Sequence, residues 1–319
     1  MPIARMILQR IGLGCLTLLL VSAVIFFSVE LLPGDLAEEI LGQDATPETV
    51  AALRLQLGLT QPAPVRYLAW LGGMLRGELG MSLANRLPIT EILAGRLGNT
   101  LFLAAFAALL AVPAAIGGGL VAAMFRNRAL DRTLSMSSLA VVSLPEFMLG
   151  YLLIYAFAGS GLFPAISYVT ETTGFLERIH LTFLPALSLA LAISAHMLRM
   201  TRASVINVLA APYIEIARLK GLSNRIVIGR HAFPNAIAPI ANVVALTLAY
   251  LITGVVVIEV VFAYPGLGKL MVDSVSKRDI PVVQAVGLMF AAIFIVANLL
   301  ADIVATLSNP RLLHRTAAG

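Results

Sequence analysis

Six long apolar stretches constrain the fold of this chain more than any other feature. They cover about residues 11–32, 100–125, 134–158, 181–200, 236–258 and 282–307. Each is long enough to cross a bilayer as a helix, which takes roughly 20 mostly apolar residues. Hydrophobic residues make up 59% of the sequence and charged residues only 12%, about half the charged share of soluble domains. The sequence therefore predicts an all-α polytopic membrane protein with six transmembrane helices.

The first stretch has the basic flank of a secretory signal, because Arg5 and Arg10 precede the apolar run. From Ile11 to Leu32 it spans about 30 Å as a helix, and no small-residue cleavage site follows it. It is therefore predicted to be a membrane helix. The single cysteine, Cys15, lies inside it, and one thiol makes neither an internal disulfide nor a cysteine-based metal site.

The basic residues indicate the orientation in the membrane, because Lys and Arg are enriched in short cytoplasmic loops. If the N-terminus is cytoplasmic, the inner segments hold most of the Lys and Arg against two carboxylates, Asp131 and Glu215. Both termini are therefore predicted to be cytoplasmic. The net charge of +5 follows from this pattern. Basic runs with interleaved aromatics are lacking, so no nucleic-acid partner is expected.

A long segment at about 33–99 is predicted to form a small helical cap on the extracytoplasmic, or periplasmic, face. Residues 46–48, Thr-Pro-Glu, have the order of a helix start: an N-cap, a proline and an acid. Residues 65–75 place aromatic and Leu side chains at helical spacing. A linker is the alternative, but linkers are poorer in such residues. The chain then divides into a tail and first helix at 1–32, the cap, and a core at 100–319.

The charged segment YIEIARLKGLSNRIVIGRHAFPN, at 213–235, lies between two very apolar stretches. Tyr213 to Lys220 is predicted to form a short helix that Gly221 ends, because glycine permits a left-handed backbone. Ser223 should begin a second helix that ends near Pro234. Two short helices joined by a sharp turn would project from the bundle as a cytosolic knob.

The knob combines charge with apolar surface. Glu215 and Arg218 stand three residues apart and share a helix face, as do Arg218 and Leu222 at four residues. Apolar surface is expected from Leu219, Leu222, Ile226 and Ile228. Such a knob suits a groove on another protein. An amphipathic helix lying on anionic lipid is the alternative that these residues leave open.

Residues 215–221, EIARLKG, resemble the EAA loop of ABC importer permeases, in which Glu-Ala-Ala is followed after three residues by Gly and later by Pro. The matching positions are Glu215, Ala217, Gly221 and Pro234. Ile216 replaces the second Ala, and His231 and Phe233 replace the usual Ile and Leu. The whole chain is similar to the oligopeptide, dipeptide and nickel branch of that family, with pieces in the same order that include LPGDLAEEI at 32–40, SLPEFMLGYLLI at 143–154, EVVFAYPGLGK at 259–269 and NPRL at 309–312. This branch commonly has a basic residue where Glu215 stands, so any salt bridge there is expected to differ.

The resemblance implies a type I ABC importer permease fold in the bacterial or archaeal cytoplasmic membrane, with a coupling loop at 207–235 that docks on a cytosolic ATPase. The implied coupling residues are Tyr213, Glu215, Ala217, Arg218, Lys220, Gly221, Leu222 and Pro234. The implied partners are a second, nonidentical permease, two cytosolic ABC ATPases, an extracytoplasmic solute-binding protein and membrane lipid. Di- and oligopeptides are the expected substrates, with nickel or metal chelates, glutathione and oligosaccharides as alternatives.

The chain itself is not expected to be an enzyme. Gly268-Lys269 lacks the first glycine and the Ser or Thr of a phosphate-binding loop, so ATP and Mg²⁺ are assigned to the partner ATPases and no cofactor to this chain. Residues 159–161, Gly-Ser-Gly, with His180 and His196 would allow an intramembrane serine protease, but a serine between glycines favours a turn. No His, Cys and carboxylate spacing predicts a metal site.

Glu146 is predicted to be the one deep carboxylate, in the third stretch, where an unpaired charge costs about 2.5–3.5 kcal/mol. It is expected either on the solute path or in a structural bond with a group such as His196. Phe262 and Tyr264 are expected at the outer mouth, as part of a gate or of an aromatic belt at the lipid interface. A structural role is expected for Asp302. An ion-coupled secondary transporter would need a relay of such ionisable residues and often an inverted repeat.

Glycine and proline positions give two packing predictions. Gly117–Gly119 should form a closely packed helix face, with lining of the solute path as the alternative. The prolines inside the apolar stretches should kink their helices; they are Pro113, Pro145 and Pro185.

Overall fold

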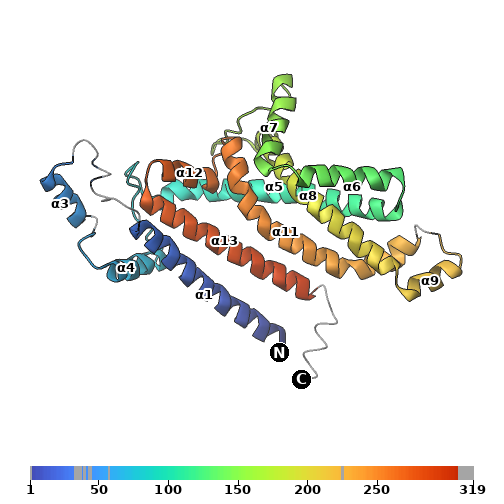
Figure 1. The fold of residues 1–319 in the computed structure, drawn as a ribbon. Coiled ribbons are helices and arrows are strands. Elements are labelled where there is room, and N and C mark those ends of the chain that lie inside the picture. Colours follow the sequence, from blue (N-terminus) through green and yellow to red (C-terminus); the bar gives the residue numbers. More distant parts are fainter. Residues whose placement is uncertain are drawn as a thin grey trace.

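The computed structural model describes residues 2–31, 38, 41, 45–56, 58–223 and 226–307 (Figure 1). The NPRL piece at 309–312 and the C-terminus lie outside these residues. Within the described residues, five helices are long and apolar enough to cross a membrane: α1 (Pro2–Glu30), α5 (Ile89–Met124), α8 (Phe175–Leu209), α11 (Phe233–Val261) and α13 (Ile280–Leu307). A bent pair, α6 (Ala129–Val142) and α7 (Glu146–Phe157), makes a sixth span if it is counted as one. The predicted all-helical membrane fold is confirmed.

Two of the long helices extend well beyond the predicted apolar stretches. α5 begins at Ile89, so one continuous helix crosses the predicted boundary between cap and core at residues 99 and 100. α8 covers Phe175–Leu209, although its apolar stretch covers only about 181–200. Polar residues at the helix ends, such as Arg96 and Arg199, interrupt the apolar pattern without interrupting the helix.

The third predicted span is wrong as a single helix. α6 ends at Val142, α7 begins at Glu146, and the two are bent by 108°. Pro145 was expected only to kink the helix, but it lacks an N–H and drives the preceding residue out of the α-helical region, which favours a full break. Pro113 and Pro185, in contrast, lie inside continuous helices. Figure 1 shows α7 standing away from the other long helices.

The core lies around α8, which is the most buried of the candidate spans. Its side chains pack with those of α5 and α11 in one large apolar cluster that includes Leu103, Leu184, Met197 and Leu251. A Cβ atom on Gly118 would lie 2.7 Å from Leu198 Cδ1, and one on Gly119 would lie 2.6 Å from Thr201 Cβ. Gly117 has nothing within 4 Å. The predicted close-packing glycine face is therefore confirmed at two of its three positions.

The predicted cap contains two described helices, α3 (Pro47–Gln56) and α4 (Ala63–Leu75). The predicted start of α3 is confirmed, since Thr46 Oγ1 accepts a hydrogen bond from the Thr49 amide at 3.3 Å. α4 packs on α1 through an aromatic cluster of Phe26, Phe27, Tyr67 and Trp70. In Figure 1, α3, α4 and α12 (Leu267–Ser276) lie at one end of the long helices and α9 (Pro212–Leu219) at the other. We call these the α12 end and the α9 end.

Candidate functional site

α9 is a short helix between α8 and α11, in the segment that the sequence predicts as a knob. It covers Pro212–Leu219, and the Lys220 amide still donates to the Ile216 carbonyl at 3.1 Å. Gly221 follows with a φ of +79°, the left-handed backbone that glycine adopts without strain. The predicted short helix and its glycine break are confirmed.

The second predicted helix of the knob does not end near Pro234. From Ile226 the chain is helical, passes through a π-helical segment, η3 (Val227–Ala232), and continues into α11. Pro234 lies in the first turn of α11, where its missing N–H removes no bond of that helix. Ser223 precedes this segment, and its carbonyl accepts from the Val227 amide at 3.0 Å. The proline was misread as a stop because it also fits a helix start.

Apolar packing anchors one face of α9. Ile214 is fully buried and Ala217 nearly so, and both pack against Val227 and Ala232 of η3. Leu222 is partly buried against the same cluster. Ile228 was expected to supply knob surface, but it is 2% exposed and packs towards α5 and α8. The base of the knob is therefore a small apolar core of its own.

The opposite face of α9 is exposed and carries large apolar side chains. Tyr213 is 44% exposed, Ile216 54% and Leu219 81%. Glu215 and Lys220 are exposed beside them. The side chain of Arg218 lies outside the described part of the structure, so its predicted pairing stays a prediction. We call Tyr213, Ile216 and Leu219 the α9 docking face, because exposed apolar groups rimmed by charge are typical of protein contacts.

A buried ion pair ties α6 to α8 near the α9 end. The Arg202 guanidinium donates to both carboxylate oxygens of Asp131, at 2.6 and 2.8 Å. The Asn127 amide adds a third bond at 2.8 Å, and Asp131 is 3% exposed. Sequence reasoning counted both charges as loop residues, because nothing local relates positions 71 residues apart.

A second pair, Arg10 with Asp302 at 2.6 Å, joins α1 to α13, which agrees with the structural role expected of Asp302.

At the α12 end, Glu259 is fully buried, and sequence reasoning missed it. Its carboxylate accepts bonds from Thr100 Oγ1 at 2.6 Å, the Gly268 amide at 2.6 Å and the Lys269 amide at 3.1 Å. The Leu267 amide in turn donates to Thr100 Oγ1 at 2.8 Å. Glu146 is therefore not the one deep carboxylate. A signal was present, since an acid shortly before a Pro-Gly-Leu-Gly helix start is a candidate cap for the amides of that helix.

Phe262 and Tyr264 lie in the core beside this carboxylate. Both are fully buried, and the Tyr264 hydroxyl donates to the Asn99 carbonyl at 3.0 Å. Neither ring faces the surface of the chain, so the alternative of an aromatic belt against lipid is wrong for both. Burial follows from the tight turn after α11, which folds the chain back over α5 and α8.

A third buried carboxylate, Asp279, joins two loops at the α12 end. It accepts bonds from the Ser82 hydroxyl and from the amides of Leu83, at 3.0 Å, and Ala84, at 3.3 Å. It stands directly before α13, so the segment at residues 82–84 is fastened to the junction of α12 and α13.

Glu146 is the first residue of α7 and lies against α11. A Cβ atom on Gly254 would lie 2.7 Å from its Oε2, so the carboxylate occupies the space that this glycine leaves. Glu146 is half-buried. Among the described contacts it has no hydrogen bond or ion pair, and His196, its expected structural partner, is exposed on α8.

The remaining catalytic candidates have other partners. Ser160 Oγ donates to the Phe157 carbonyl at 2.6 Å, in a turn closed by Gly161 with a φ of +72°. His180 Nε2 bonds the Leu162 carbonyl at 2.8 Å, and its ring stacks on Phe163. No group of three or more His, Cys, Asp or Glu side chains comes together within the described ranges.

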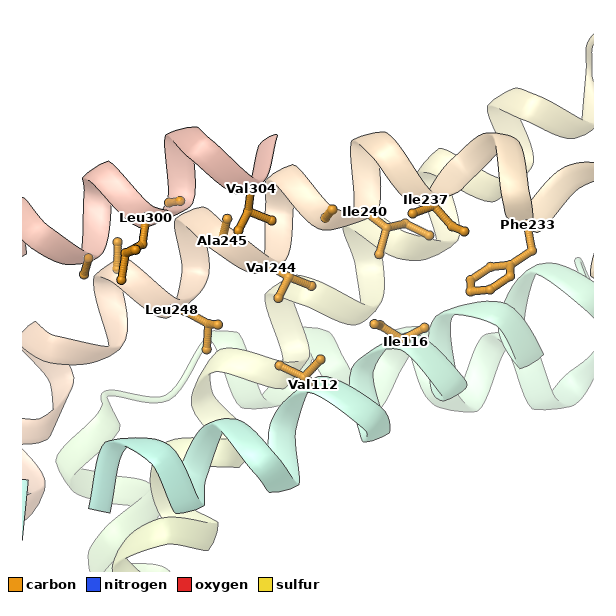
Figure 2. Close-up of a pocket in the computed structure, with 14 residues that line it drawn as sticks. Val112, Ile116, Phe233, Ile237, Ile240, Val244, Ala245, Leu248, Leu300 and Val304 are labelled. Carbon is orange, nitrogen blue, oxygen red and sulfur yellow. The ribbon is translucent and has the colours of Figure 1, made fainter. Parts of the chain in front are cut away.

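An apolar cavity of about 450 Å³ lies between α5, α11 and α13 (Figure 2). Figure 2 shows Val112 and Ile116 of α5 facing Val244 and Leu248 of α11 across it. All of its lining residues are apolar. It offers no side-chain donor or acceptor to a peptide, so we do not assign the solute site to it.

The fold defines a class: a multi-pass helical membrane protein with one short helix, α9, that projects beyond the long helices. The family model for the binding-protein-dependent transport system inner membrane component matches residues 115–314, and the model for its N-terminal part matches residues 3–104. The chain belongs to this family and is an ABC transporter permease of the inner membrane.

Similar proteins match this chain over nearly its whole length. A "probable peptide ABC transporter permease protein" of Sinorhizobium fredii is 35% identical over 96% of this chain and 98% of its own length. A glutathione transport system permease protein of Escherichia coli is 37% identical over 94% of this chain and 95% of its own length. Membership in this family implies ATPase and binding-protein partners, and it displaces the alternative of an ion-coupled secondary transporter.

Proposed function

We propose that this chain is one of two nonidentical permeases in an ATP-driven importer, and that α9 is the helix through which cytosolic ATPases move it. The observation that carries the proposal is the construction of α9. One face is anchored by Ile214 and Ala217, while Tyr213, Ile216 and Leu219 remain exposed on the other. A rigidly anchored apolar face can transmit the movement of whatever binds it. ATP and Mg²⁺ would bind only to the two ATPases.

The proposed orientation places the α9 end and both termini in the cytoplasm and the α12 end outside. The loop between α5 and α6, which contains Arg126 and Arg128, lies at the same end as α9, and its positive charge supports this orientation. Labelling with a membrane-impermeant thiol reagent in intact cells tests it. Leu55→Cys on α3 should react, and Leu219→Cys on α9 should react only after the membrane is opened.

The proposed substrates are di- and oligopeptides. Support comes from the relatives, since one is named as a peptide permease and another serves glutathione, itself a tripeptide. Nickel or metal chelates and oligosaccharides have no such support among these relatives. We also propose that Glu146 lies on the solute path. Phe262 and Tyr264, which are buried in the core around α11, are proposed to help close an outer gate.

Association with the ATPase tests the coupling role. Gly221→Pro forces a φ near −65° where the turn requires +79°, and it should abolish co-purification of the ATPase. Gly221→Asn is the matched control, because asparagine tolerates the left-handed region. Glu215→Arg should weaken association while the protein still inserts. Unchanged association in both Gly221→Pro and Glu215→Arg would contradict the coupling role.

A further inference from the structure

Glu146, which is half-buried, differs from the three buried carboxylates described above in having no donor within the described part of the chain. Asp131, Glu259 and Asp279 each accept at least three hydrogen bonds. Glu146 has neither a hydrogen bond nor an ion pair among the described contacts, although it lies at the break of a candidate span. The described part of the chain therefore supplies no donor to this carboxylate, which is half-buried and partly exposed.

The position is built for a negative charge. Glu146 stands in the first turn of α7, where the positive end of the helix dipole stabilises an anion. Gly254 leaves room for the carboxylate on α11. One turn further along α7, Gly150 packs closely on Val261 and Phe262, so the face of α7 that carries Glu146 is fixed against α11.

We propose that Glu146 binds the protonated amino group of the substrate, the α-ammonium of a di- or oligopeptide in transit. This inference rests on the proposed function. An ammonium group fits a single carboxylate, because it is compact and donates up to three bonds. A divalent metal ion does not, since hard cations take six or more oxygen ligands and no group of three or more His, Cys, Asp or Glu side chains forms among the described residues. Pairing with an ammonium group offsets the cost that an unpaired charge carries inside a membrane.

The experiment compares uptake of Ala-Phe and N-acetyl-Ala-Phe by the assembled transporter in proteoliposomes, each presented at a concentration that saturates the solute-binding protein. The same binding protein serves every permease variant, so a change in preference belongs to the permease. Glu146→Gln keeps the shape and removes the charge. It should lower Ala-Phe uptake about tenfold, which corresponds to about 1.4 kcal/mol, and leave N-acetyl-Ala-Phe uptake unchanged.

Two further variants separate position from charge. Gly254→Ala keeps the charge but displaces the carboxylate, and it should reduce the preference for the free amine in the same direction. Glu177→Gln is the matched control, because Glu177 is exposed in the first turn of α8, and it should leave the preference unchanged.

Equal reduction of both peptides, or no reduction, in Glu146→Gln would overturn the proposal. Loss of the second permease from the purified Glu146→Gln complex would also overturn it, because Glu146 would then pair with a cationic group of that subunit and not with the substrate. Failure of the wild-type transporter to take up either peptide would instead refute the peptide assignment, and the amine site with it.

Discussion

The knob at the α9 end and the loops at the α12 end are held in place by different forces. At the α9 end, the knob is anchored by a few apolar side chains around Ile214, and its outer face is left exposed. At the α12 end, Glu259 and Asp279 fasten four segments through directed hydrogen bonds. Apolar packing is non-directional, whereas buried polar networks specify one geometry. The α9 knob therefore keeps an exposed apolar face, whereas the hydrogen bonds at the α12 end hold its loops in one geometry.

The largest effect on stability is expected at Glu259. Glu259→Ala would leave the Thr100 hydroxyl and two backbone amides without an acceptor, at about 1–3 kcal/mol for each unsatisfied group. The three groups together should cost about 3–9 kcal/mol, seen as a lower melting temperature in detergent. Glu91→Ala, at an exposed position in the first turn of α5, is the control and should have little effect. Equal melting temperatures for the two variants would show that the hydrogen bonds of Glu259 do not stabilise the α12 end.

An intermediate effect is expected for the pair of Asp131 and Arg202. Asp131→Ala leaves a cation with 28% side-chain exposure unpaired, so the cost should fall below the roughly 3–5 kcal/mol of a fully buried pair, at about 2–3 kcal/mol. The double variant with Arg202→Ala should cost less than the two single changes added together. Additive costs in thermal unfolding would show that the two side chains act independently.

A small effect is expected for Arg10 and Asp302. Their side chains are 51% and 31% exposed, and exposed ion pairs contribute about 0–1 kcal/mol. Asp302→Asn should therefore shift the melting temperature slightly, and less at high salt. A loss as large as that of Asp131→Ala would mean that this contact is buried in the assembled transporter.

The sequence predicts the helical class, the cap helices and the α9 break because each depends on local patterns. Apolar length fixes the spans, Thr46 marks a helix start, and Gly221 marks a left-handed turn. The 108° break at Pro145 was underestimated, since the same proline signal serves kinks and breaks. The pairing of Glu259 with Thr100 and of Asp131 with Arg202 was not predictable, because these residues are 159 and 71 positions apart and meet only through the packing of α5, α6, α8 and α11.

The central claim is that Leu219 and its neighbours on α9 contact the ATPase. Cys15 is the only cysteine, so Cys15→Ser gives a cysteine-free chain, to which Leu219→Cys or Leu55→Cys is added at positions 81% and 74% exposed. A photoactivatable group on the new cysteine is then crosslinked in the assembled transporter. A crosslink to the ATPase from position 219 and none from position 55 is the predicted result. Crosslinks from position 219 to lipid alone would contradict the account.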